Sequence, residues 1–423
     1  MRKPILKGLE FPEWLGKYGY LILFGLLTQI FSILHSPNSF ISGTNRAFCN
    51  YYITKFRIFN VHIDCDSQYF LLDSQNPLRL FRDQTPLQDR PLHTFIVFII
   101  SKVFGFIGIP PGATTYLGED SIPQTYNIMN YGIFVAINAA ILMASILIVL
   151  RVMLKSDSIR GPFFKVSILL AILLITQNPI TREYFWTPHS QIFNLLIPAV
   201  LFYFVQKDLK LNTRRFYIIF FLISLSLLAY PTFIILLPVF FLITWKSLGK
   251  LYALLILASL IPKFLWPIIL NALGGQYVDW PVVGHRRFIW VLDSYKSKSL
   301  VQDLGTNLSA FMNSLPWLWV IITLFILLIG LLYVINVRYT VVRTTRSDLI
   351  SSAVAFFSYL FGMILNGEYG PRFTIGVVVL LSLLILNEVS ALSTKLKYMY
   401  VAYFGIFLAN CWAWLTNWAW LPN

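Results

Sequence analysis

The feature that most constrains this chain is a series of apolar blocks, each about as long as a helix that crosses the hydrocarbon core of a bilayer. The blocks recur from residues 18–34 to residues 398–415 of a 423-residue chain. Charged residues make up only 12% of the sequence, whereas a soluble protein uses about 25% to cover its surface. A chain with this pattern is a polytopic integral membrane protein. The pattern excludes a soluble enzyme, a nuclear factor and a secreted scaffold held together by disulfides.

Helices of membrane-spanning length are the expected secondary structure. Between the first and last blocks, apolar segments cover residues 91–110, 127–150, 166–180, 188–205, 216–245, 251–273, 316–336, 349–366 and 373–387. Their number predicts an all-α fold with about eleven or twelve transmembrane helices, in a single transmembrane domain over residues 1–423. Residues 216–245 are too many for one straight helix and contain Tyr230-Pro231, so they form either one kinked helix or two short helices.

Two longer polar segments, residues 35–90 and residues 274–315, are expected to be external loops. The orientation follows from Lys and Arg, which are retained in cytoplasmic loops. They give the chain a net charge of +15. They gather in the loops 151–165, 207–215, 338–346 and 395–397. These loops, and the basic N-terminus, are therefore assigned to the cytoplasm.

The segment 91–110 disturbs this alternation. With a cytoplasmic N-terminus, a full crossing by this segment would place the basic loop 151–165 outside. Either the segment does not cross fully, or residues 216–245 are a single span and two basic loops face outward. Lys102, in the middle of the segment, favours an interrupted segment.

The residues most able to carry chemistry stand in the first polar segment. Its motif Asp64-Cys65-Asp66 holds two carboxylates that can share a metal ion, or divide the work of a base and an orienting group. Further on, Asp89-Arg90 opens the next apolar segment, where a cation at the interface can hold a lipid phosphate. The acidic tripeptide alone is a weak signal because surface loops commonly contain acids.

These residues, together with Glu368-Tyr369-Gly370-Pro371-Arg372-Phe373, resemble the GT-C superfamily of membrane glycosyltransferases. The resemblance implies many helices, a cytoplasmic N-terminus and a long first external loop with an acidic motif. It also implies a sugar donor carried on a polyprenyl phosphate. The shared architecture covers the whole chain, whereas the motifs cover only these short stretches.

The motifs and the resemblance together suggest roles for individual residues. Asp66 is the expected general base that deprotonates the acceptor hydroxyl, with Asp64 as its alternative. The residues expected to bind substrate are Asp89, Arg90, His189, Arg286, Arg287, Glu368 and Arg372. The alternative for Arg286-Arg287 is an anchor at the membrane interface, and for His189 it is a helix cap. The metal requirement is unknown, a divalent cation being one alternative, and no other cofactor is expected.

The expected function is that of a membrane glycosyltransferase, which moves a sugar from a polyprenyl-phosphate carrier to a glycan, lipid or protein acceptor. We expect it in the bacterial inner (plasma) membrane, in contact with membrane lipid and with the active site facing outward. A transporter or flippase of lipid-linked saccharides and an oligosaccharide polymerase are the alternatives. Nucleic acid is not an expected partner, because no basic run carries interleaved aromatic residues.

Overall fold

The structure is a computed structural model of the chain. It describes residues 51–56, 59–63, 65–82, 88, 90–109, 113–117, 123–155, 168, 171–172, 174–176, 179–206, 211–275, 290–314, 346–366 and 371–390, together with Gly19. The apolar blocks expected at 18–34 (apart from Gly19), 316–336 and 398–415, and part of the block at 166–180, lie outside these residues.

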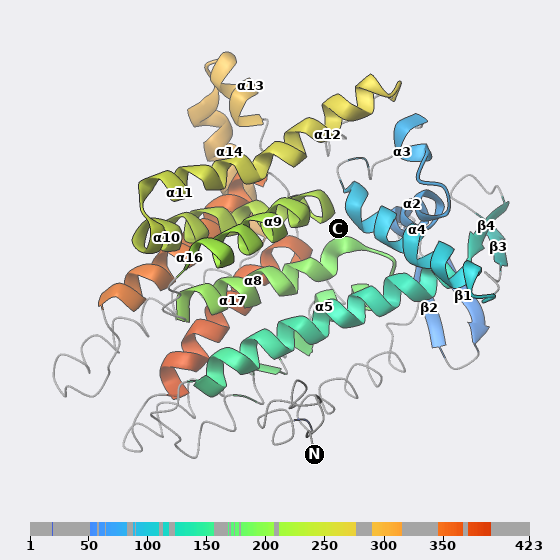
Figure 1. The fold of residues 1–423 in the computed structure, drawn as a ribbon, viewed down its shortest axis with the longest axis horizontal. Helices are drawn as coiled ribbons and strands as arrows, with labels where there is room; N and C mark the ends of the chain where they lie inside the picture. The colour runs from blue at the N-terminus through green and yellow to red at the C-terminus, as the bar shows by residue number, and fades with distance from the viewer. Residues whose placement is uncertain are drawn as a thin grey trace, which may run out of the picture.

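Within the described residues the chain is mostly helical, as expected (Figure 1). Three helical stretches are long and apolar enough to cross a membrane. They are α5 (Ile128–Lys155), η2 (Pro231–Leu236) with α10 (Leu237–Leu248), and α11 (Lys250–Leu255) with η3 (Ile256–Leu260) and α12 (Ile261–Ala272). These stretches coincide with the apolar segments expected at 127–150, in the second half of 216–245, and at 251–273.

The core is built around α8 (Phe193–Gln206), of whose 14 residues nine are buried and none is exposed. A helix that is apolar on all sides must be enclosed, and α8 contacts α5, α10, α16 (Arg346–Asn366) and α17 (Pro371–Ser390). Pro198, inside α8, cannot donate the hydrogen bond that would end on the carbonyl oxygen of Asn194. At this point α17 approaches with Gly376, where a Cβ atom would lie 3.1 Å from that oxygen. The glycine thus allows close packing of two helices.

Residues 216–245 form two helices joined by a sharp turn. The first helix, α9 (Thr213–Ala229), ends before Tyr230, which is extended at φ −157°, and η2 begins at Pro231. Phe216, at the start of α9, stacks on Phe240 of α10 with ring centroids 5.8 Å apart. This contact between distant positions shows that the two helices run antiparallel. The two-helix alternative is therefore confirmed, and the turn falls where proline cannot continue a helix.

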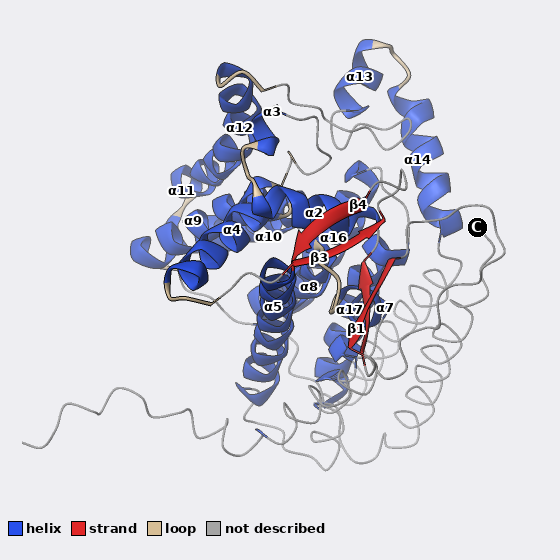
Figure 2. Cartoon of the chain, turned by 90° about the vertical axis from the view of Figure 1, so that its right-hand side faces the viewer, coloured by secondary structure: helices blue, strands red, loops and turns tan. Residues whose placement is uncertain are grey.

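The segment 91–110 forms α4 (Pro91–Phe106), which is continuous through Lys102. An interruption at Lys102 is therefore wrong, and its exposed ammonium lies 5.3 Å from the ring centroid of Phe98. The 16 residues of α4 extend about 24 Å, less than the ~30 Å of a hydrocarbon core. Figures 1 and 2 show α4 running across the direction of α5, near the end at which α5 begins. Its length and direction favour a segment that does not cross fully.

The first polar segment contains folded elements rather than loop alone. The hairpin of β1 (Tyr51–Phe56) and β2 (Phe59–Ile63) precedes α2 (Cys65–Gln75) and the short α3 (Arg79–Arg82). A second antiparallel hairpin, β3 (Ala113–Leu117) with β4 (Pro123–Asn127), links α4 to α5. Within the described part of the chain these two hairpins are the only strands (Figure 2).

A small apolar cluster holds α2 and α3 against α4 and α5. Its buried members are Phe70, Leu71, Leu80, Val97, Ile133 and Phe134. Polar contacts reinforce it: the amide of Asn130 in α5 donates to the hydroxyl of Ser74 in α2 at 2.9 Å. The indole of Trp266 in α12 donates to the carbonyl of Gln88 at 2.6 Å. α2, α3 and Gln88 are therefore docked on the bundle.

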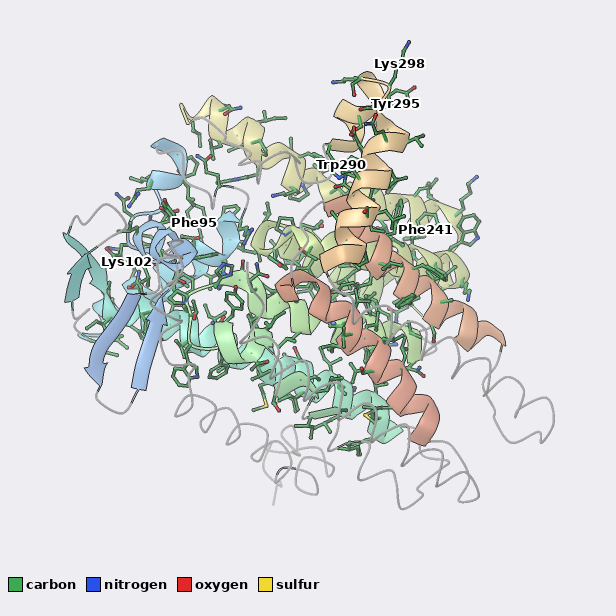
Figure 3. The ribbon with its side chains drawn as sticks, turned by 180° about the vertical axis from the view of Figure 1, so that it is seen from behind. Phe95, Lys102, Phe241, Trp290, Tyr295 and Lys298 are labelled. Atoms are coloured by element: carbon green, nitrogen blue, oxygen red, sulfur yellow. The ribbon has the colours of Figure 1, made fainter. Side chains whose placement is uncertain are left out.

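The second polar segment includes α13 (Trp290–Lys296) and α14 (Leu300–Ser314). The indole of Trp290 donates to the carbonyl of Leu365 near the end of α16, at 2.8 Å. Figure 3 shows Tyr295 and Lys298 beyond Trp290, at the far end of α13, and both are exposed. This part of the expected loop is therefore helical and is attached to the end of α16.

Many large apolar side chains lie on the outside of the helical body. On α9 and on α11 to α12 they include Tyr217, Ile218, Phe221, Leu222, Leu251, Leu257, Ile261, Phe264, Ile268 and Ile269. A soluble protein rarely exposes a continuous apolar surface of this kind, whereas lipid tails cover it at no cost. The exposed faces of these helices therefore agree with a membrane setting.

Candidate functional site

A cluster of buried polar side chains lies where α4, the 3₁₀-helix η1 (Ser190–Ile192) and the turn at Tyr230 meet. Buried polar groups are unfavourable in an apolar core unless hydrogen bonds or a role in binding compensate. The polar members of the cluster are Arg90, His93, His189, Ser190, Gln191 and Asn194, all 7% exposed or less. Their concentration at one place in an apolar protein marks this cluster as the candidate site.

Arg90 is the N-cap residue directly before α4, and its guanidinium is held from two sides. Nη1 donates to the hydroxyl of Ser190 at 3.0 Å. The Cζ atom stands 5.5 Å from the centroid of the Tyr230 ring, within the range of a cation–π interaction. The two contacts join the start of α4 to η1 and to the α9–η2 turn, and they fix the orientation of the guanidinium plane.

The residues of η1 form a hydrogen-bonded network with Tyr230. His189 caps η1, because its Nδ1 accepts from the backbone N–H of Gln191 at 3.1 Å. The side-chain oxygen of Gln191 accepts from the Asn194 amide at 2.7 Å and from the Tyr230 hydroxyl at 3.0 Å. The capping alternative for His189 is thus confirmed. It does not remove the residue from the site, since the capping histidine lies beside the groups that hold Arg90.

Two residues of α5 fix the chain just before His189. The amide of Asn138 is within 2.9–3.2 Å of the carbonyls of Tyr184, Phe185 and Thr187. The hydroxyl of Tyr131 donates to the carbonyl of Trp186. Residues 185–188 follow α7 (Pro179–Tyr184) without regular structure, so side chains must satisfy the buried carbonyls at and after the end of this helix. This anchoring sets the position from which η1 and α8 begin.

Aromatic rings enclose the two histidines of the cluster. Phe70 of α2 contacts both of them, with ring centroids 5.7 Å from His93 and 5.2 Å from His189. His93 also meets Phe134 at 5.1 Å and Phe193 at 5.8 Å. His93 therefore lies within a shell of three phenylalanine rings, one turn after Arg90 on α4.

The two predicted residues with helical positions next to this cluster are Asp66 and Arg372. Asp66 is the second residue of α2, one turn before Phe70 on the same face of the helix. Arg372 is the second residue of α17, one turn before Gly376. Phe70 contacts the histidines, and Gly376 packs beside the carbonyl of Asn194. The backbones that carry these residues thus begin at the edge of the site.

The remaining predicted residues Asp64, Asp89, Arg286, Arg287 and Glu368 lie outside the described part of the chain. In the described part, no group of three or more His, Cys, Asp or Glu side chains could hold a metal ion. The described side chains of the cluster therefore do not fit a metal centre.

Comparison of the chain with protein-family models, with curated proteins and with solved structures finds no match.

Several residues of the cluster were not expected from the sequence. Tyr230 was noted only as the position of a kink, and His93, Gln191 and Asn194 were not singled out. The available signal was the presence of polar residues inside or at the start of apolar segments, where they are rare unless they serve a function. His93 follows Arg90-Pro91-Leu92 and is the clearest instance.

Proposed function

We propose that this chain is a membrane glycosyltransferase that transfers a sugar from a polyprenyl-phosphate carrier to a hydroxyl group of a glycan, lipid or protein. The observation that supports it best is the buried guanidinium of Arg90, held by Ser190 and Tyr230. The first turns of α2 and α17, with Asp66 and Arg372, adjoin the cluster that contains it. A carboxylate can take the acceptor proton, and guanidinium groups can neutralise a phosphate leaving group.

Arg90 is proposed to hold the carrier phosphate. A guanidinium can donate two parallel hydrogen bonds to a phosphate, which an ammonium cannot do. Its contacts with Ser190 and Tyr230 orient it in advance, so that less side-chain entropy is lost on binding. The N-terminus of α4, with the proline of that helix at its first position, adds partial positive charge at the same place.

The proposed reaction is a displacement at the anomeric carbon of the sugar. The oxygen of the acceptor hydroxyl forms a bond to that carbon while the bond from the carbon to the phosphate oxygen breaks. The sugar ring is transferred intact. The carboxylate of Asp66, or of Asp64 in its place, takes the hydroxyl proton. The electron pair of the broken bond leaves with the polyprenyl phosphate, whose added charge Arg90 and Arg372 neutralise.

The placement of basic residues supports an outward-facing site. α5 begins near the cluster and ends after Arg151, and α8 leads from η1 to the basic loop 207–215. α9 runs in the other direction, from Arg214 to Tyr230. In each case the basic end is opposite to the cluster, and basic ends face the cytoplasm. A multi-pass protein of the bacterial inner membrane with an external active site accounts for this pattern.

The test is the reaction of the purified protein in lipid nanodiscs with citronellyl phosphate esters of glucose, mannose and arabinose, which are short analogues of a polyprenyl-phosphate donor. We expect wild-type protein, supplied with a native membrane extract as acceptor, to release citronellyl phosphate from one ester. Asp66→Asn should lower the rate by about 10²–10⁴-fold, the usual contribution of a general base, with Tm unchanged. Asp64→Asn shows whether the neighbouring acid has that role instead.

The alternatives predict other outcomes of the same experiment. A transporter or flippase would move a fluorescent lipid-linked saccharide across proteoliposomes with its sugar–phosphate bond intact. Turnover that survives both aspartate substitutions would also contradict the assignment of the base to the first polar segment. Absence of citronellyl phosphate release with every ester and every acceptor extract would overturn the proposed function.

A further inference from the structure

His93 is a buried polar residue to which the proposed reaction assigns no role. It is 2% exposed and lies in the first turn of α4. Among the described residues neither Nδ1 nor Nε2 has a hydrogen-bond partner. The rings in contact with it are those of Phe70, Phe134 and Phe193.

A histidine with two unsatisfied nitrogens is an unfavourable choice for a core position. Each buried donor or acceptor left without a partner loses its hydrogen bonds to water and gains none in return. Phenylalanine would fill the same aromatic shell without that cost, and the surrounding residues show that the chain uses it freely here. A polar residue that breaks the local rule without a visible gain is the kind that serves binding or catalysis.

The chemistry of the shell favours a hydroxyl-bearing group over an anion. A charged imidazole would be costly among three apolar rings. An uncharged imidazole has one donor and one acceptor nitrogen. A sugar hydroxyl is likewise both a donor and an acceptor, and the C–H faces of a sugar ring suit contact with aromatic rings. Ligand sites commonly combine apolar, aromatic walls with a few polar groups of this kind.

The position of His93 relative to Arg90 matches a lipid-linked sugar. Arg90 is the residue directly before α4 and His93 is the third residue of that helix, so about one turn of chain separates them. Phe70, which contacts His93, also contacts His189, the neighbour of the Ser190 that accepts from Arg90. In a polyprenyl-phosphate sugar the ring is bonded directly to the phosphate. If Arg90 holds the phosphate, the adjoining sugar ring is within reach of the imidazole.

Phe70 is the part of the shell that can give access. It belongs to the short helix α2, whereas Phe134 and Phe193 belong to the long core helices α5 and α8. Its ring contacts both His93 and His189. Phe70 is therefore the ring whose displacement we expect to give a sugar access to the two imidazoles.

We propose that His93 is a sugar-binding residue, which hydrogen-bonds a hydroxyl group of the donor sugar beside the phosphate held by Arg90. The inference depends on the proposed function, since it names the part of the donor that a further residue of the same site recognises. It makes His93 a determinant of sugar binding and assigns it no proton transfer.

The experiment measures the affinity of the full-length protein in nanodiscs for citronellyl phosphate and for its glucose, mannose and arabinose esters, by titration calorimetry. Wild-type protein should bind one ester more tightly than the bare phosphate. In His93→Phe this preference should fall by about tenfold, as expected for loss of a good hydrogen bond, while the affinity for citronellyl phosphate changes less than about twofold. The Tm should not fall, because an unsatisfied polar group has been removed.

Thr94→Val is the matched control. The hydroxyl of Thr94 is equally buried, adjoins His93 in α4 and has no hydrogen-bond partner among the described residues. Its removal should leave both affinities unchanged. His93→Gln, which keeps a donor and an acceptor, should retain part of the preference, and it replaces His93→Phe as the test if that variant does not fold.

Each outcome bears on one of the two proposals. An unchanged sugar preference in His93→Phe overturns the role of His93 and leaves the proposed function standing. An equal loss of affinity for the bare phosphate and the ester also overturns it, because His93 would then act only through the packing of α4. If wild-type protein binds none of the lipids, the proposed function fails, and the sugar-binding role fails with it.

Discussion

At the scale of single residues, Asn138 has a structural role that is separate from the proposed chemistry. Its one amide group is near three carbonyls of residues 184–187, and all of these groups are buried. Asn138→Leu would leave those carbonyls without a donor from α5. We expect the free energy of unfolding to fall by about 1–3 kcal/mol and the Tm, followed by tryptophan fluorescence, to fall with it.

A second variant of α5 provides the control for this loss. Ser145 is also buried, but its hydroxyl donates to the carbonyl of Ile141 one turn earlier in the same helix. That carbonyl is already the acceptor of a helical N–H, so Ser145→Ala should change the Tm little. An equal fall in both variants would mean that α5 is sensitive to any polar substitution, and the anchoring role of Asn138 would be wrong.

The sequence identified the polar residues that stand in motifs and missed those that stand alone. Arg90 and His189 were expected because each opens an apolar segment, and both lie in the buried cluster. His93 and Gln191 were missed because a lone polar residue within an apolar segment has no pattern to distinguish it. Their significance depends on contacts between segments distant in the chain, such as the bond from Tyr230 to Gln191, and local sequence does not encode these contacts.

At the scale of helices, Gly376 determines how closely α17 approaches its neighbours. A Cβ atom there would clash with the hydroxyl of Tyr359 in α16 and lie 3.1 Å from the carbonyl oxygen of Asn194 in α8. We therefore expect Gly376→Ala to lower the Tm through overpacking, which costs about 1–3 kcal/mol. The displaced α17 should also weaken binding of citronellyl phosphate, since Arg372 lies one turn earlier in that helix.

Gly132 provides the control for Gly376, because it is a helical glycine without a close neighbour. It is exposed on α5, and a Cβ atom there would meet nothing within 4 Å. Gly132→Ala should raise stability by about 0.5–1 kcal/mol, because alanine is the better helix former. The double variant Gly376→Ala, Tyr359→Phe should recover part of the lost Tm. No recovery would show that the contact with Asn194, rather than with Tyr359, sets the limit.

Helices were predictable from the sequence to the extent that one apolar run makes one helix. α5 follows this rule, and its long run predicted it well. At Tyr230-Pro231 the sequence allows either one kinked helix or two short helices, because proline marks a break without giving the direction of the chain after it. α4 shows the opposite difficulty: its composition is that of a span, but its direction across the bundle depends on packing against α2 and α5. The fold within residues 35–90 was missed because its apolar residues are dispersed among polar ones.

At the scale of the whole molecule, α4 and the α9–α10 hairpin together would remove the conflict in the predicted topology. If α4 stays at one end of the bundle and residues 216–245 cross twice, every loop rich in Lys and Arg is cytoplasmic. This arrangement gives about eleven spans by the length criterion. It also places both polar segments, the β3–β4 hairpin and the turn at Tyr230 on the external side, together with the candidate site.

The decisive measurement compares single cysteines on the two sides of α4, in a protein whose Cys49, Cys65 and Cys411 have been replaced by serine. Asn76 precedes α4 in an exposed position, and Thr115 follows it in β3. In intact cells, a membrane-impermeant maleimide should label both Asn76→Cys and Thr115→Cys, because a helix that does not cross leaves its two flanks on one side. Arg151→Cys and Arg214→Cys, at exposed basic ends of α5 and α9, should react only after the membrane is opened.

Two results would contradict this arrangement. Labelling of Asn76→Cys without Thr115→Cys would mean that α4 crosses the membrane, and labelling of Arg214→Cys in intact cells would mean that a basic loop faces outward. The first result would contradict a helix α4 that stays at one end of the bundle, although Arg90 would still be external with Asn76. The second would place Tyr230, and with it the cluster around Arg90, on the cytoplasmic side, and would contradict an outward-facing transferase.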